Sequence, residues 1–299
     1  MQVFRSLVTV ALVLGLVTPS LAQDRPRIVT VNYALQYLAE RLTGGEAEVI
    51  FPVPAGVDPS FWRPSIADIT MIQSADLILL NGAGFATWVD RVSLPRAKTV
   101  NTSAKIKDQF ISTESITHSH GDGGEHSHEG LASYLWLDPT LAIAQAEAVA
   151  AAMASRDLVP ASEIYASFAE LRSELEKLDA STADALATAR GIPMIATHPR
   201  YQYLAQRYDL SITSLEWEAG AMPTQEELAD LERLVAELDA RILIWEAQPP
   251  REGIEAADAL GLESVVFNPL ARASADDSFV EAYASAVSDL SDAVSSSRN

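Results

Sequence analysis

The sequence predicts an α/β protein with two β/α lobes, each containing a mostly parallel sheet, joined by one long rigid helix. In both halves of the chain, short apolar segments alternate with stretches that have helical periodicity. Residues 77–80 read Leu-Ile-Leu-Leu. Such a wholly apolar run is typical of a strand whose two sheet faces are both covered by helices. Between Pro160 and Arg190, apolar residues recur at spacings of three and four, which predicts the long helix.

The first half of the chain predicts one β/α lobe. Gly44-Gly45 ends its first helix, and a proline-rich stretch at 54–65 forms a stiff loop after the second strand. Ser65 or Asp68 is placed to cap the next helix. The expected strands are 27–32, 47–53 and 76–81, and the expected helices are 33–43 and the stretch that ends at Ser74.

The second half predicts the linking helix and the other lobe. A helix at 139–156 precedes the long helix, which Gly191 ends. The apolar stripe of the long helix is Ile164, Phe168, Leu171, Leu175, Leu178 and Leu186. The expected strands that follow are 193–197, 211–215, 241–246 and 264–268, with helices at 200–208, 224–238, 253–260 and 277–294.

The chain begins with a predicted secretory signal peptide at 1–22. Arg5 supplies the positive charge, 7–17 is an apolar run too short to span a bilayer, and Ser20-Leu21-Ala22 is a cleavage signal. We therefore expect an N-terminal lobe at 23–155, which includes a His-rich loop at 117–130. A linking helix at 156–190 and a C-terminal lobe at 191–299 follow.

Composition narrows the location and the class of protein. The chain has no cysteine, which excludes disulfides, thiolate metal sites and a lipid-modified cysteine, so we expect a periplasmic protein that is not a lipoprotein. The net charge of −20 argues against a nucleic-acid partner and favours cations. No nucleophile motif, phosphate-binding loop or metalloprotease motif is present, so we expect a monomeric binding protein and not an enzyme.

The loop at 117–130 contains four of the five histidines. They form two His-x-His pairs among acidic residues and glycines, a nitrogen and oxygen ligand set that suits zinc or another late divalent cation. A flexible loop of this kind would bind metal weakly, and a solvated spacer is the alternative interpretation. The four loop histidines are His118, His120, His126 and His128.

His198 is the fifth histidine and lies at the carboxyl end of the predicted strand 193–197. Ligands of open α/β sheets bind just outside the carboxyl ends of the strands, so we expect His198 to face the ligand. Four carboxylates lie near other strand ends or in the expected binding loops, and one or two of them are expected to complete a metal site with His198: Asp58, Glu216, Glu218 and Glu246. A helix cap, a salt bridge or an exposed acid is the alternative for each.

Several segments occur in the order found in one known family. They are 57–65, the His-rich loop, 135–139, 197–208, 215–218, 244–246 and 267–270. On these segments nearly the whole mature chain resembles the metal-binding solute-binding proteins of zinc and manganese ABC transporters, the ZnuA/TroA-like class. The resemblance implies capture of a divalent metal between the lobes and delivery to an ABC permease in the inner membrane.

The resemblance also implies which positions hold the metal. The family's three histidines and one aspartate correspond to Ser60, Tyr134, His198 and Asn268 in this chain. Three of the four expected ligands are thus replaced by neutral groups that are poor zinc ligands. Arg63 and Arg200 lie nearby and can pair with an anionic ligand or with the surrounding acids.

Three functions remain open at this stage. The first is a receptor that delivers a divalent metal, with zinc the leading cargo, whose binding should weaken below about pH 6 as histidine protonates. The second keeps the fold but binds a metal chelate or small organic solute, with Trp62 and Trp136 either lining the pocket or packing in the core. The third is a periplasmic metallochaperone or zinc buffer that acts through the His-rich loop.

Overall fold

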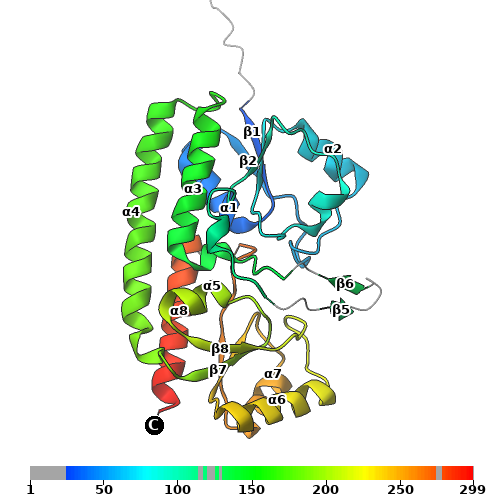
Figure 1. Ribbon diagram of the computed structural model, residues 1–299, viewed down its shortest axis with the longest axis vertical. Coiled ribbons are helices and arrows are strands. Elements are labelled where there is room, and N and C mark those ends of the chain that lie inside the picture. Colours follow the sequence, from blue (N-terminus) through cyan, green and yellow to red (C-terminus); the bar gives the residue numbers. More distant parts are fainter. Residues whose placement is uncertain (1–24, 114–116, 120–124, 128–129, 274–277, 299) are drawn as a thin grey trace, which may run out of the picture.

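The structure is a computed structural model that describes residues 25–113, 117–119, 125–127, 130–273 and 278–298. It contains two four-stranded sheets, one in each half of the chain, and every strand pair within them is parallel. The two lobes lie one above the other, and a long helix runs alongside both of them (Figure 1). The predicted fold class is therefore confirmed. The predicted signal peptide at 1–22 lies outside the described residues.

The N-terminal sheet has the strand order β2-β1-β3-β4. Apolar side chains of the central strands β1 and β3 are almost fully buried because helices cover the sheet. The short edge strand β4 was not predicted, since it has only three residues. The strands are β1 Arg27–Thr30, β2 Glu48–Ile50, β3 Leu77–Leu80 and β4 Thr99–Asn101.

Local capping sets the helix boundaries of this lobe. Helix α1, Tyr33–Thr43, starts where the Asn32 side chain accepts a hydrogen bond from the backbone N–H of Leu35, and it ends at Gly44 with a φ of +56°. Helix α2, Ile66–Ser74, begins with a reciprocal capping box between Ser65 and Asp68. Helix α3, Pro139–Ala154, has Asp138 as its cap and proline in its first turn.

Helix α4, Ala161–Ala185, is the predicted linking helix. Its length of about 40 Å follows from a rise of about 1.5 Å per residue. It contacts α1 and α3 of the N-terminal lobe and α8 of the C-terminal segment, and its buried face includes Leu171 and Leu175. The helix ends sooner than predicted because a 3-10 turn, Ala187–Ala189, precedes Gly191. In the part of the chain that the structure describes, no helix is long and apolar enough to cross a membrane.

The C-terminal sheet has the order β10-β9-β7-β8, with β7 and β9 at its centre. Its strands are β7 Pro193–Ala196, β8 Ser211–Ser214, β9 Ile242–Trp245 and β10 Glu263–Val266. The helices that follow these strands are α5 Gln202–Tyr208, α6 Gln225–Leu238, α7 Arg251–Ala259 and α8 Phe279–Ser296.

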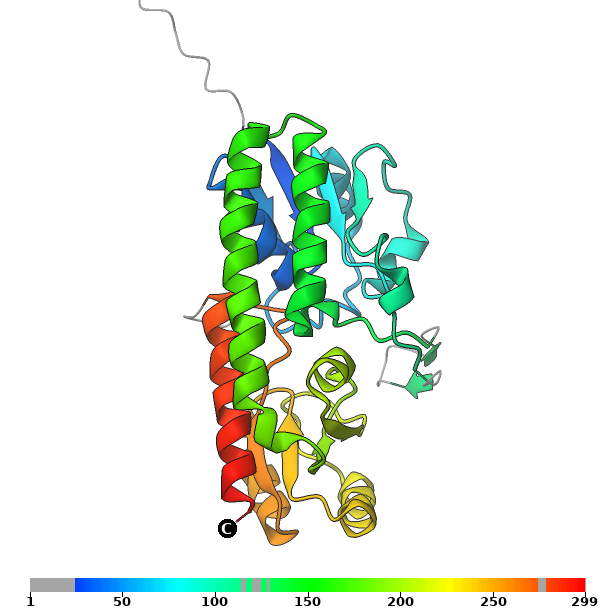
Figure 2. The same cartoon turned by 60° about the vertical axis from the view of Figure 1, so that its left-hand side comes forward.

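The last helix, α8, joins the two lobes together with α4. In Figure 2 α8 runs beside the lower half of α4, on the left of the view. Near the start of α8, Phe279 stacks on Tyr37 of α1 with ring centroids 5.3 Å apart. Farther along, α8 contacts β10 of the C-terminal sheet. The lobes are thus held by two long helices, which leaves little freedom for a wide hinge motion.

The segment predicted as a His-rich loop contains a short two-stranded hairpin, β5 Thr117–Ser119 and β6 Glu125–Ser127. Its antiparallel register places His118 opposite His126. The hairpin lies at the level where the two lobes meet in both views (Figures 1 and 2). His120 and His128 lie outside the described residues.

Candidate functional site

The carboxyl ends of the C-terminal strands face loops of the N-terminal lobe across a cavity of about 440 Å³, which we call the interlobe pocket. His198 and Arg200 follow β7, Glu218 follows β8, and Glu246 follows β9. This is the location at which open parallel sheets bind ligands. The pocket is lined by Gly56, Val57, Asp58, Pro59, Phe61, Tyr134, His198, Arg200, Glu218, Ala219, Glu246, Ala247, Asn268, Pro269, Ala271 and Arg272.

His198 is held in one orientation by the C-terminal lobe. Only 6% of its surface is exposed. Its Nδ1 lies 2.8 Å from the carbonyl oxygen of Trp217 and 3.2 Å from Oε2 of Glu246. Because both neighbours are acceptors, we place the proton on Nδ1, so Nε2 carries the lone pair that a metal requires. Metal-ligating histidines typically donate their second ring N–H to a carbonyl or carboxylate in this way.

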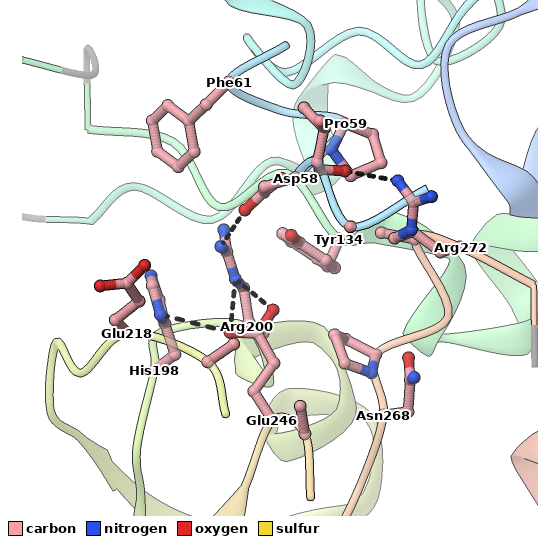
Figure 3. Close-up of a pocket in the computed structure, with 16 residues that line it drawn as sticks. Asp58, Pro59, Phe61, Tyr134, His198, Arg200, Glu218, Glu246, Asn268 and Arg272 are labelled. Carbon is pink, nitrogen blue, oxygen red and sulfur yellow. Dashed lines mark hydrogen bonds and ion pairs between the residues drawn. The ribbon is translucent and has the colours of Figure 1, made fainter. Parts of the chain in front are cut away.

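Arg200 crosses the interlobe pocket and links the lobes. Its Nη2 donates to Oδ2 of Asp58 at 2.7 Å, on the N-terminal side. Its Nε lies 3.3 Å from both carboxylate oxygens of Glu246, on the C-terminal side. The guanidinium carbon lies 4.8 Å from the ring centroid of Tyr134, within the range of a cation–π contact. Figure 3 shows Arg200 between Asp58 above and the His198–Glu246 pair below.

Asp58 is an ionised partner of Arg200. Its second oxygen, Oδ1, accepts hydrogen bonds from the backbone N–H of Ser60 at 2.8 Å and from the Ser60 hydroxyl at 2.6 Å. Burial alone would raise the pKa of the Asp58 carboxyl, but the Arg200 charge and the two Ser60 hydrogen bonds outweigh it and lower that pKa. Both carboxylate oxygens of Asp58 are therefore already engaged.

Glu246 differs from Asp58 in its surroundings. Its side chain is 12% exposed. Burial raises the pKa of the Glu246 carboxyl, and the nearby Asp58 charge adds to this, while Arg200 offsets it only in part. Arg200 stays a cation, because the charges around it overcome the effect of its burial and raise its pKa. The pocket thus contains one fixed cation between two carboxylates of unequal basicity.

The three neutral residues at the family's ligand positions lie in different settings. Ser60 is buried, donates to Asp58 and does not line the interlobe pocket. Tyr134 lines the pocket, and its buried hydroxyl has no hydrogen-bond partner among the described residues. Asn268 lines the pocket as an exposed residue, and its Oδ1 accepts from the backbone N–H of Leu270 at 2.8 Å.

The candidate carboxylates are brought to the same pocket. Asp58 and Glu246 are paired with Arg200, whereas Glu218 is an exposed residue at the edge of the cavity. Within the described ranges, no three His, Cys, Asp or Glu side chains are grouped closely enough to hold a metal ion. The side chains of His118, His120, His126 and His128 lie outside the description, so their role in metal binding stays a prediction.

Some expectations about the pocket walls change. Trp62 and Trp136 pack in the hydrophobic core and do not line the pocket. Trp136 contributes indirectly, because its indole N–H donates to the carbonyl of Pro269 at 2.7 Å and fixes the Asn268–Pro269 wall. Arg272, which donates to the carbonyl of Val57, was not identified from the sequence. No local pattern distinguished it, because its contact lies far along the chain.

Two parallel-sheet lobes, a long bridging helix and a ligand pocket between them define a solute-binding protein. The family profile described as "Zinc-uptake complex component A periplasmic" matches residues 28–293. The chain therefore belongs to this family of ABC-transporter solute-binding proteins, which confirms the resemblance found in the sequence. The prediction that the protein is not an enzyme is confirmed on the same ground, and the family places the protein outside the cytoplasm.

Individual relatives are distant. The high-affinity zinc uptake system protein ZnuA of Bacillus subtilis is 25% identical over 256 residues, which cover 83% of this chain and 79% of that protein. The zinc-binding lipoprotein AdcA of Streptococcus pneumoniae is 26% identical over 265 residues, which cover 86% of this chain. This chain spans about half the length of the streptococcal relatives, 52% in that case.

A solved structure shows the same fold. The solute-binding protein FpvC of Pseudomonas aeruginosa, in complex with Mn²⁺, matches with a TM-score of 0.74 at 20% identity. The match covers 91% of this chain and 99% of that one. The names of these relatives include more than one metal, so the metal that this chain binds has to be argued from its own residues.

Proposed function

We propose that the protein is the extracytoplasmic receptor of an ABC importer and that its cargo is a divalent metal, with zinc the leading candidate. The observation that carries this proposal is the setting of His198 in the interlobe pocket. Its Nδ1 is engaged by a carbonyl and a carboxylate, at 2.8 Å and 3.2 Å. This arrangement orients Nε2 as a ligand and increases its basicity.

Carboxylates supply the rest of the proposed ligand set. Glu246 is one candidate, but it contacts His198 at Nδ1, so it would have to leave Nδ1 to bind a metal ion held at Nε2. Glu218 and Asp58 line the same pocket and are the further candidates. One imidazole with two or three carboxylates is a nitrogen and oxygen set that zinc and other late divalent cations accept. Ser60, Tyr134 and Asn268 would contribute hydrogen bonds and not metal ligation.

The second candidate function keeps the receptor and changes the cargo to a metal chelate or a small organic solute. The size of the cavity, about 440 Å³, favours it, and so does an apolar wall formed by Val57, Phe61, Ala219 and Pro269. Pairing of Asp58 and Glu246 with Arg200 points in the same direction, because it reduces the oxygens available to a bare ion. The Tyr134 hydroxyl, which has no hydrogen-bond partner among the residues that the structure describes, would bond to a polar atom of such a solute.

The proposed cellular setting follows from the sequence and the family. We place the mature protein in the periplasm after cleavage at Ala22. The proposed partner is an ABC permease of the inner membrane. A gene for such a permease and its ATPase beside this gene would support import over a free-standing metallochaperone.

Calorimetric titration of the purified mature protein tests the proposal. Zinc, manganese, ferrous and cupric ions are titrated into the wild type, into His198→Ala, and into a variant with the four loop histidines replaced by asparagine. We expect one zinc site that His198→Ala weakens at least tenfold and that the loop variant retains.

Two other results would redirect the assignment. Zinc binding lost only in the loop variant would favour the metallochaperone function of His118, His120, His126 and His128 and would reject the pocket as the metal site. Absence of binding for all four metals would reject the metal receptor and favour the chelate or organic cargo.

A further inference from the structure

The interlobe pocket contains a cation that belongs to the protein itself. Arg200 is only 7% exposed and contacts a carboxylate of each lobe. The two carboxylates, Asp58 and Glu246, are also two of the candidate ligands for a metal. A guanidinium with donors at 2.7 Å and 3.3 Å therefore occupies the oxygens that a divalent ion would need.

We propose that Arg200 is a resident cation that competes with the cargo metal for Asp58 and Glu246, so that metal enters this part of the pocket only when the guanidinium leaves. This inference rests on the proposed metal-receptor function and adds a residue that sets affinity and selectivity. It makes Arg200 a positioning residue for the two carboxylates and one of the contacts between the lobes in the metal-free protein.

Charge in the pocket supports competition. The charged side chains that line it are Asp58, Glu218, Glu246, Arg200 and Arg272. With Arg200 in place, three acids face two cations, and the attraction for a divalent ion is largely cancelled at short range. Removal of the Arg200 charge leaves Asp58 and the mostly buried Glu246 without their shared cation, and a metal ion would then satisfy both.

Geometry distinguishes this arrangement from an ordinary surface ion pair. Arg200 follows His198 by two residues, so the cation and the proposed imidazole ligand are carried on one turn after β7. The Oε2 atom of Glu246 lies 3.2 Å from Nδ1 of His198, and the same atom lies 3.3 Å from Nε of Arg200. Movement of the guanidinium therefore changes the contacts of Glu246, which orients His198, and also those of Asp58 in the other lobe.

The test compares Arg200→Gln with Arg207→Gln in a mature chain whose four loop histidines are asparagine. Arg207 is the matched control, since it pairs with Asp179 and Asp138 in the same part of the chain but does not line the pocket. Both changes alter the net charge equally. Zinc affinity is measured by calorimetry at one ionic strength, together with the circular dichroism spectrum of each variant.

We expect Arg200→Gln to bind zinc at least tenfold more tightly than its parent, and Arg207→Gln to bind as the parent does. Addition of Glu246→Gln to Arg200→Gln should abolish the gain. An Arg200→Gln variant whose zinc affinity equals or falls below that of its parent would overturn the inference, and so would an equal gain in Arg207→Gln.

A second variant covers the case in which Arg200→Gln fails to fold. Arg200→Lys keeps the charge but lacks the planar fork that reaches both carboxylates, so we expect a smaller gain of about threefold. No gain in a folded Arg200→Lys protein would then overturn the inference. The two proposals fail on different results. If Arg200→Gln binds zinc and its parent does not, the metal-receptor function is rejected. If both proteins bind zinc equally and through His198, competition by Arg200 is rejected.

Discussion

Two arginines close together in the chain show how surroundings determine what an ion pair does. Arg200 pairs with Asp58 and Glu246, and its side chain is 8% exposed. Arg207, in helix α5, pairs with Asp179 of α4 through Nε at 2.8 Å and Nη2 at 2.5 Å, and its side chain is 38% exposed. Each arginine joins segments far apart in the sequence. Of these two arginines, Arg200 is the one that joins the two lobes across a ligand pocket.

The difference lies in what happens when the arginine is removed. Water and salt can replace a half-exposed partner such as Arg207, so the pair contributes little net free energy. When a buried partner is removed, the charges that it neutralised stay buried with neither water nor a counter-ion, which lowers the stability strongly. The intact buried pair itself adds little net free energy of folding. We therefore interpret Arg207 as half of a surface ion pair that links α5 to α4, and Arg200 as part of the ligand site.

The largest expected effect is on stability after removal of Arg200. Arg200→Ala should lower the free energy of unfolding by about 3–5 kcal/mol, because Asp58 and Glu246 lose their shared cation. Arg207→Ala should lower it by about 0–1 kcal/mol. Urea unfolding followed by circular dichroism measures both values. Equal losses in the two variants would remove the distinction between the two sites.

Replacement of Asp58 should have the next largest effect. Asp58→Asn should cost about 1–2 kcal/mol near neutral pH, a value reduced because the Asp58 side chain is 32% exposed. Since the pKa of Asp58 is lowered on folding from an ordinary value of 3.8, its stabilisation is complete above that value and is lost as the pH falls through the lower folded pKa.

Unfolding curves from pH 7 to pH 3 measure this dependence. The difference between Asp58→Asn and the wild type should stay constant down to about pH 4 and then shrink. A difference that disappears between pH 7 and pH 5 would show that Asp58 is not the ionised partner of Arg200.

Glu246 should behave with the opposite sign. Burial raises its pKa above the ordinary 4.5, so the folded state binds a proton more tightly than the unfolded state. The wild type therefore gains stability from Glu246 as the pH falls through the raised folded pKa, and this gain is complete below 4.5. Glu246→Gln should change stability by about 1 kcal/mol or less at pH 7 and should abolish this gain on acidification. The unfolding curves from pH 7 to pH 3 measure this gain as the difference between the wild type and Glu246→Gln. If the wild type instead lost stability relative to Glu246→Gln on acidification, the raised pKa of Glu246 would be contradicted.

The smallest expected effect is at Tyr134. Its hydroxyl is buried and has no hydrogen-bond partner among the described residues. Tyr134→Phe should therefore change the free energy of unfolding of the metal-free protein by less than about 0.5 kcal/mol, since no hydrogen bond is lost. A larger loss in the same urea assay would reveal a partner for the hydroxyl.

Much of the fold could be predicted from the sequence because its signals are local. The apolar run at β3 and the stripe along α4 each depend on residues within one element. The capping residue Ser65 marks the start of α2. Strand β4 could not be predicted, because its three residues, Thr-Val-Asn, are too few for their alternation to give a periodic signal.

The site was harder to predict because its contacts are not local. His198 was identified from its place at a strand end, and it lines the interlobe pocket. The pairing of Arg200 with Asp58 joins residues 142 positions apart. Among many acids in this chain, no pattern selects Asp58 as the partner. The core positions of Trp62 and Trp136 also depend on packing between distant segments.

Anomalous diffraction at the zinc absorption edge, from crystals of the zinc-loaded mature protein, tests the central claim most directly. We predict one peak in the interlobe pocket at about 2.0–2.1 Å from Nε2 of His198, with carboxylate oxygens completing the site. In the same map the Arg200 guanidinium should have left Asp58 or Glu246. A zinc ion elsewhere, with the Asp58–Arg200–Glu246 contacts unchanged, would contradict this account.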